Sequence, residues 1–131
     1  AAFAAGGHKV VAMTGDGGFY LNMTEIWTAV QERADVVILV MNDRAYGVIK
    51  DIQNTLYGGR PFAADPIGPD LGGLAKLAGM PFWRVSKLAD LGPMLSEAIA
   101  VDGPALVEVD MTKFGPYPRY FTPPPYAKAA E

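Results

Sequence analysis

Hydrophobic residues in this chain fall into short continuous runs, separated by segments with helical spacing. The strongest run is Val-Val-Ile-Leu-Val-Met at 36–41, and others cover 9–14, 82–85 and 105–110. Continuous runs of this kind, rich in β-branched residues, are typical of parallel strands that are covered on both faces. The segments at 22–33 and 87–101 instead place apolar residues three and four positions apart, as amphipathic helices do. Strands therefore alternate with helices, which predicts an α/β fold with a parallel sheet in three α/β/α layers.

Polar and glycine residues mark where the helices begin and end. Asn22-Met23-Thr24-Glu25 has the pattern of a capping box, so we expect a helix to begin there and to run to about Arg33. A short helix is expected over 44–52, interrupted by Gly47. Another is expected over 70–78, ended by Gly79.

Composition limits the classes of function. The chain has 131 residues and a net charge of −3, which fits a single globular domain without the basic runs of a nucleic-acid-binding protein. Its longest apolar run, at 36–41, falls far short of the roughly 18 residues of a membrane span. Cysteine is absent, which excludes disulfides and thiolate metal sites and fits a cytoplasmic location.

The two ends differ from the middle of the chain. The opening Ala-Ala-Phe-Ala-Ala-Gly-Gly resembles the end of a helix that runs into a turn, so we expect a fragment that begins within a domain. The end of the chain carries five prolines among residues 116–125. We therefore divide the chain into a partial domain at 1–112 and a proline-rich arm at 113–131.

Two polar motifs follow predicted strands. Gly15-Asp16-Gly17-Gly18 comes after the first strand, and Asn42-Asp43-Arg44 comes after the next, with Asn42 placed 26 residues after Asp16 (42 − 16). Ligands of parallel sheets bind outside the carboxyl ends of the strands, where these motifs would meet. Carboxylate and amide oxygens suit Mg²⁺, and glycine N–H groups suit phosphate oxygens. Each motif alone is ordinary turn chemistry, but the pair predicts a site for a divalent cation and a diphosphate.

Gly15-Asp16-Gly17, Phe19 and Asn42 at this spacing resemble the cofactor motif of the thiamine diphosphate-dependent enzymes. The segments 21–29, 42–49, 69–79 and 103–109 are similar to the branch that contains acetolactate synthase, benzoylformate decarboxylase and pyruvate oxidase. The resemblance covers about residues 5–112. It implies the thiamine diphosphate-binding fold, here incomplete at its N-terminus, with thiamine diphosphate and Mg²⁺ as cofactors.

The resemblance also implies roles for particular residues. The side-chain oxygens of Asp16 and Asn42 and the backbone carbonyl of Arg44 would bind the metal ion. Asp43 stands where this branch most often has Asn, and is not expected to be a ligand. The wider set implied to contact the cofactor is Gly15, Asp16, Gly17, Gly18, Asn42, Arg44, Tyr46, Gly47, Val48 and Ile49.

The resemblance implies a 2-oxo acid decarboxylase or carboligase similar to acetolactate synthase. No catalytic acid or base is assigned to this chain, because in this family that glutamate lies on another domain of a neighbouring subunit. The chain alone is therefore expected to be inactive, and the complete protein to be a homodimer or homotetramer. The alternatives are an enzyme similar to benzoylformate decarboxylase or pyruvate oxidase, and a non-catalytic module that binds Mg-diphosphate or serves as a scaffold.

Overall fold

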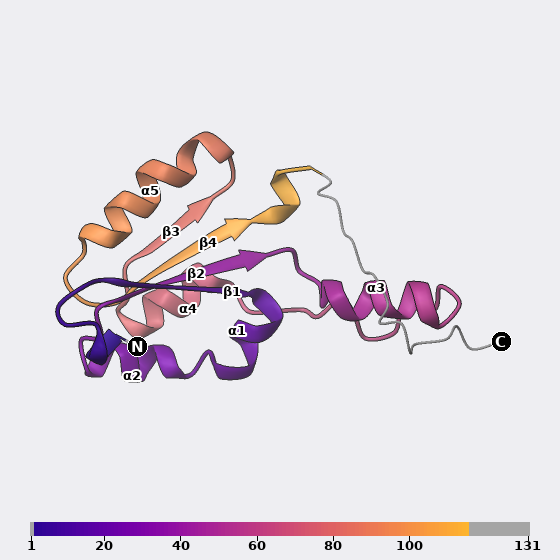
Figure 1. The fold of residues 1–131 in the computed structure, drawn as a ribbon, viewed down its shortest axis with the longest axis horizontal. Coiled ribbons are helices and arrows are strands. Elements are labelled where there is room, and N and C mark those ends of the chain that lie inside the picture. Colours follow the sequence, from indigo (N-terminus) through magenta and orange to yellow (C-terminus); the bar gives the residue numbers. More distant parts are fainter. Residues whose placement is uncertain (1, 116–131) are drawn as a thin grey trace.

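A four-stranded parallel sheet forms the centre of the protein (Figure 1). The computed structural model describes residues 2–115. The strands are β1 (Val10–Gly15), β2 (Val36–Asn42), β3 (Phe82–Val85) and β4 (Ala105–Asp110), in the spatial order β1-β2-β4-β3. All four predicted strands are confirmed. The carboxyl ends of β1, β2 and β4 therefore lie side by side along one edge of the sheet.

Helices cover the two faces of the sheet unequally. One face packs against α1 (Asp16–Asn22), α2 (Glu25–Gln31) and α4 (Leu71–Ala78), and this core includes Ile26, Val40 and Leu106. The other face packs against α5 (Leu88–Ala100), with Val37, Val107 and Ala98 in the core. The predicted three-layer α/β/α architecture is confirmed. Helix α3 (Gly47–Leu56) extends beyond the strand ends (Figure 1).

Alternation along the strands decides which side chains meet. In β2, Val40 faces α1, α2 and α4, so Asn42, two residues later, lies on the same side. In β4, Leu106 faces that side as well, and Glu108 follows in the same phase. Pairing of Asn42 with Asp110 and of Val40 with Glu108 then brings these polar groups together at the edge of the sheet.

The predicted capping box is wrong. Asn22 is the last residue of α1, a short helix that begins directly at Asp16 and was not predicted. The residue before α2 is Thr24, and its side chain makes no capping hydrogen bond. The two glycines after Asp16 favoured a loop in the sequence, but Phe19 is buried in the core and holds this turn of helix against the sheet.

The remaining helix boundaries shift only slightly. Helix α3 begins at Gly47 instead of being interrupted by it, and α4 is capped by the Asp70 side chain and ended by Gly79 in the left-handed conformation (φ 70°). Within residues 2–115, no helix has the length and hydropathy that a membrane crossing requires. The proline-rich arm predicted at 113–131 lies almost wholly outside the described residues, and the division into two parts stays a prediction.

We expect Leu106→Ala to lower the free energy of unfolding by about 2–5 kcal/mol, because Leu106 is fully buried between the sheet and the helices α1, α2 and α4. Urea unfolding followed by circular dichroism measures the change. Leu88→Ala is the control: Leu88 is 71% exposed, so the change should stay within about 0.5 kcal/mol. Equal midpoints for the two variants would contradict this assignment of the core.

Candidate functional site

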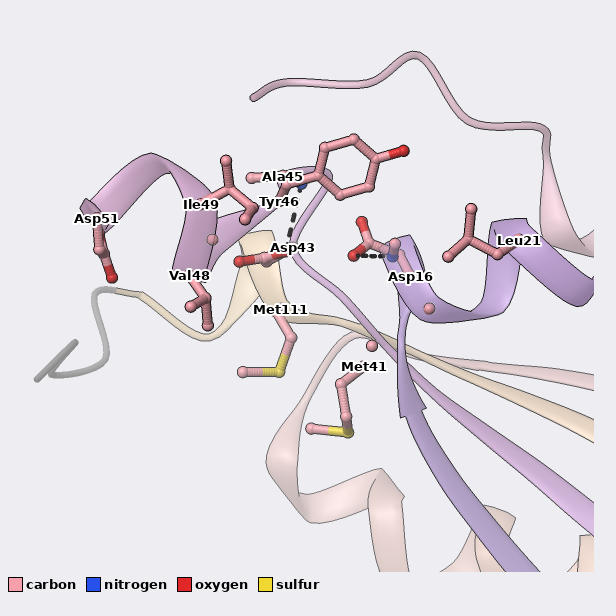
Figure 2. Close-up of a pocket in the computed structure, with 14 residues that line it drawn as sticks. Asp16, Leu21, Met41, Asp43, Ala45, Tyr46, Val48, Ile49, Asp51 and Met111 are labelled. Carbon is pink, nitrogen blue, oxygen red and sulfur yellow. Dashed lines mark hydrogen bonds between the residues drawn. The ribbon is translucent and has the colours of Figure 1, made fainter. Parts of the chain in front are cut away.

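The strand edge carries a cavity of about 620 Å³ beside the end of β1 (Figure 2). It is bounded by the start of α1, the turn after β2 and the first turns of α3. Eight of the ten residues implied to contact the cofactor line it: Gly15, Asp16, Gly17, Gly18, Tyr46, Gly47, Val48 and Ile49. The structure therefore brings together most of the residues that were expected to contact the cofactor. That they contact a cofactor stays a prediction.

Asp16 is the most constrained polar group in this cavity. It is 2% exposed, and its Oδ1 accepts a hydrogen bond of 2.8 Å from the Gly17 N–H. Its Oδ2 is buried and has no hydrogen-bond partner among the described residues. A buried carboxylate oxygen without a donor is costly, so the site suits a group that supplies positive charge.

Asp43 lies across the cavity from Asp16. Figure 2 shows the two carboxyl groups facing the same space below the Tyr46 ring. Asp43 Oδ1 accepts a hydrogen bond of 3.3 Å from the Ala45 N–H, which turns the chain back at the end of β2. The sequence reasoning did not count Asp43 as a ligand, yet its position one residue past the strand places it in the cavity.

The pKa of Asp16 reports this environment. Burial raises the pKa of the carboxyl group above its usual range, the Gly17 amide opposes that shift, and the charge of Asp43 adds to it. The N–H groups of Arg44 and Ala45 lower the pKa but do not cancel the effect. Two carboxylates that repel each other across a cavity are a donor set for a hard divalent cation.

Asn42 and Arg44 do not face this cavity. They line a second one, of about 500 Å³, beside β4 and the loop before α4. The Asn42 side-chain amide donates to Glu108 Oε1 at 2.8 Å, and its Oδ1 accepts from the Arg44 N–H at 3.1 Å. The Arg44 guanidinium contacts Asp110 Oδ2 at 3.2 Å. The structure thus places the implied ligands Asp16 and Asn42 on different sides of the strand ends.

Six further residues line the first cavity without having been predicted to do so. Ala45 and Asp43 belong to the turn after β2. Alternation along β2 could have found them, because Asn42 faces the same side as the buried Val40, and odd-numbered positions therefore face the other side. The other four come from several elements and carry no common sequence signal: Leu21, Met41, Asp51 and Met111.

A metal ion in this cavity would need ligands beyond protein side chains. Within residues 2–115, no three His, Cys, Asp or Glu side chains converge in a way that could hold a metal ion. Mg²⁺ commonly takes one or two carboxylates and completes its shell with phosphate oxygens, water and backbone carbonyls. Asp16 and Asp43 therefore fit the metal ion of a bound diphosphate better than they fit a closed structural metal site.

Comparison with known proteins shows the family to which the chain is similar. Residues 1–109 match the family described as thiamine pyrophosphate enzyme, C-terminal TPP binding domain. The mitochondrial acetolactate synthase catalytic subunit of Saccharomyces cerevisiae is 33% identical over 104 residues, which is 79% of this chain and 15% of that protein. The isozyme 3 large subunit of acetolactate synthase from Escherichia coli is 35% identical over 108 residues, or 81% of this chain and 19% of that protein.

A solved structure extends the comparison to three dimensions. The thiamine diphosphate-dependent 4-hydroxybenzoylformate decarboxylase of Rhodococcus jostii RHA1 matches with a TM-score of 0.77 and 29% identity. The match covers 83% of this chain and 21% of that one. The chain thus spans about a fifth or less of the length of each of these three proteins.

We expect Asp16→Asn to raise the free energy of unfolding in metal-free buffer at pH 7 by about 1–3 kcal/mol, since it removes a buried charge of which one oxygen has no hydrogen-bond partner among the described residues. Because the folded-state pKa of Asp16 is raised, the wild type gains stability relative to the variant as the pH falls through that pKa toward 3.8. The difference should therefore shrink on acidification. Urea unfolding at several pH values measures it, and a less stable variant at pH 7 would contradict the account.

We expect Gly17→Ala to disturb Tyr46, because a Cβ at position 17 would lie 2.5 Å from Tyr46 Cδ1. The substitution should cost about 1–3 kcal/mol, and less in a Tyr46→Ala background, which gives a coupling energy above about 0.5 kcal/mol. Gly92→Ala in α5 is the control, since a Cβ there meets open space. Additive effects of the two substitutions would show that the ring does not pack on Gly17.

Proposed function

This chain belongs to the family of thiamine pyrophosphate enzyme C-terminal, TPP-binding domains, and from that premise we propose that it holds the diphosphate end of thiamine diphosphate through Mg²⁺. Thiamine pyrophosphate and thiamine diphosphate are the same compound. The observation that carries the proposal is the buried Oδ2 of Asp16, which has no hydrogen-bond partner among the described residues, on a carboxyl group that lines one cavity together with Asp43.

The proposal assigns a role to several of the residues that line the cavity. Asp16 and Asp43 bind the cation, and a backbone carbonyl of the turn after β2 adds a ligand. Gly17 and Gly18 let the diphosphate approach the main chain closely, since neither has a side chain in the way. Tyr46, Val48 and Ile49 pack along the cofactor on the α3 side of the cavity.

The metal ligands proposed here differ from those implied by the resemblance. Asn42 bonds Glu108 and the Arg44 N–H, so Asp43 replaces it as the second side-chain ligand. The third ligand comes from the turn after β2, where Ala45 lines the cavity and Arg44 does not. Arg44 is retained in the proposal as part of the turn, with its side chain held by Asp110.

We propose decarboxylation and carboligation of a small 2-oxo acid, as in the acetolactate synthases that this chain resembles, as the activity of the complete protein. When bound, thiamine diphosphate would supply the nucleophilic carbon for addition to a 2-oxo acid and an electron sink for the charge left when carbon dioxide departs. In this proposal the residues of this chain orient the diphosphate and hold the Mg²⁺ that neutralises it, and none of them is assigned as a catalytic acid or base. The alternative is an activity of the benzoylformate decarboxylase type, since the similar Rhodococcus jostii protein is named as a 4-hydroxybenzoylformate decarboxylase.

Because this chain is proposed to bind only the diphosphate end of the cofactor, the remaining groups of the active site must come from partners. Other domains of the same polypeptide and a second subunit would supply the rest of the active site, in a homodimer or homotetramer. The chain alone would bind cofactor without turning over 2-oxo acids, and release of carbon dioxide from pyruvate by this chain alone would contradict that. The cytoplasmic location stays a proposal, since the similar yeast protein is named as mitochondrial.

We expect thiamine diphosphate to bind this chain only when Mg²⁺ is present, as measured by isothermal titration calorimetry. Asp43→Ala should weaken binding by more than about 100-fold, because even residues behind metal ligands contribute about 10–100-fold. Asp51→Ala is the matched control, since it removes an equal charge from the wall of the same cavity.

The control separates a ligand from a general effect of charge. Binding within about threefold of wild type is expected for Asp51→Ala, because a wall charge acts only through a screened interaction worth under about 1 kcal/mol. Equal losses in both variants would mean that Asp43 acts only through its charge. Unchanged binding in Asp43→Ala would return Asn42 to the list of candidate ligands. Binding that does not depend on Mg²⁺ would contradict the metal site itself.

A further inference from the structure

Glu108 is a charged residue in the most buried strand of the sheet. It lies in the middle of β4, every residue of which is buried, and is only 2% exposed. A carboxylate costs several kcal/mol to bury, and an apolar side chain of similar volume would serve the core equally well. Glu108 does not line the cavity proposed to hold the diphosphate. Its presence therefore needs a reason other than packing.

The Glu108 carboxylate is fixed on one side by Arg84. Its Oε2 accepts from Arg84 Nε at 2.7 Å, and Arg84 Nη2 donates to Asp70 Oδ1 at 2.6 Å. Asp70 is itself fixed, because its other oxygen caps α4 by accepting from the Gly73 N–H at 2.9 Å. These bonds fix the position of the carboxylate, and its second oxygen is left to face Asn42.

That second oxygen determines which way Asn42 faces. Glu108 Oε1 accepts from Asn42 Nδ2 at 2.8 Å, and an ionised carboxylate has no hydrogen to donate. The Asn42 amide must therefore present its NH₂ group to Glu108 and its oxygen to the opposite side. There the oxygen accepts from the Arg44 N–H at 3.1 Å.

This last bond holds an unfavourable turn. Arg44 has φ 57°, in the left-handed region that residues other than glycine rarely occupy. The bond from its N–H to Asn42 stabilises that conformation, and the contact from its guanidinium to Asp110 adds to it. The turn carries Asp43 and Ala45 into the diphosphate cavity (Figure 2).

We propose that Glu108 is a positioning residue for the metal site: through the Asn42 amide it holds the turn that places Asp43 opposite Asp16. The proposal rests on the proposed function, because the metal ion is what Asp43 is positioned to meet. It links α4, β3, β4 and the turn after β2 through one chain of hydrogen bonds, which a purely structural ion pair between Arg84 and Glu108 would not require.

The test begins with Glu108→Gln, which keeps the volume of the side chain. A glutamine has one accepting oxygen and one donating NH₂ group, so it cannot accept from both Arg84 and Asn42. We expect binding of thiamine diphosphate with Mg²⁺ to weaken by about 10–100-fold in calorimetry. Glu97→Gln is the matched control: Glu97 accepts from Trp83 on the surface and should leave affinity unchanged.

A second variant reverses the polarity of the bond. In Asn42→Asp/Glu108→Gln, the new NH₂ group donates to the new carboxylate, whose other oxygen still accepts from the Arg44 N–H, and the net charge is the same. We expect this double variant to recover affinity to within about threefold of wild type, a difference of under about 1 kcal/mol. Asn42→Asp alone, which sets two carboxylates against each other, should bind weakly.

Hydrogen exchange of the Arg44 amide gives a readout that needs no cofactor. The amide should be protected in the wild type and the double variant and should exchange faster in Glu108→Gln. Unchanged affinity and Arg44 exchange in a folded Glu108→Gln would overturn this inference while leaving the proposed function intact. If the single variant fails to fold, a folded double variant that does not bind would also overturn it. Absence of binding by the wild type would overturn both proposals.

Discussion

A negative charge that the protein buries and only half satisfies is the constraint on which the site depends. Asp16 lies at the junction of β1 and α1, with one oxygen bonded to Gly17 and the other unbonded among the described residues. Asp43 adds a second charge nearby and helps to raise the pKa of Asp16. The fold stores this unfavourable arrangement because packing elsewhere, around Ile26 and Leu106, holds both segments in place.

The alternation of side chains at the carboxyl edge of the sheet separates two kinds of polar chemistry. On the side of α4, Glu108 accepts hydrogen bonds from both Asn42 and Arg84. Beyond the strand end, Asp16 and Asp43 line a cavity in which Asp16 Oδ2 has no hydrogen-bond partner among the described residues. Satisfied groups are rigid, and a rigid support is what an unsatisfied binding site needs in order to keep its geometry before the ligand arrives.

The sequence predicted the sheet well because its signals are local. The runs at 36–41 and 105–110 are long, β-branched and uninterrupted, so both central strands were found, and the glycine after α4 ended that helix as expected. Helix α1 was missed because two glycines in its first turn have low helical propensity, and only the long-range burial of Phe19 overrides them. The capping box failed for the same reason, since α1 already included Asn22.

Within the site, the sequence predicted which segments come together but could not show which of two adjacent residues, Asn42 or Asp43, faces the cavity. Asn42 ends β2 and Asp43 follows it, and only the pairing of β2 with β4 shows that Asn42 is hydrogen-bonded to Glu108, 66 residues away in the chain. Met41 and Met111 reach the same cavity from different strand ends, which no local pattern reveals.

The most direct test of the account is a crystal structure of this chain grown with thiamine diphosphate and Mn²⁺, with the anomalous signal of manganese located. The account predicts one strong peak between the carboxyl groups of Asp16 and Asp43, in contact with the diphosphate, while Asn42 keeps its bond to Glu108. A peak bound by Asn42 in place of Asp43, or a diphosphate bound away from Asp16, would contradict it.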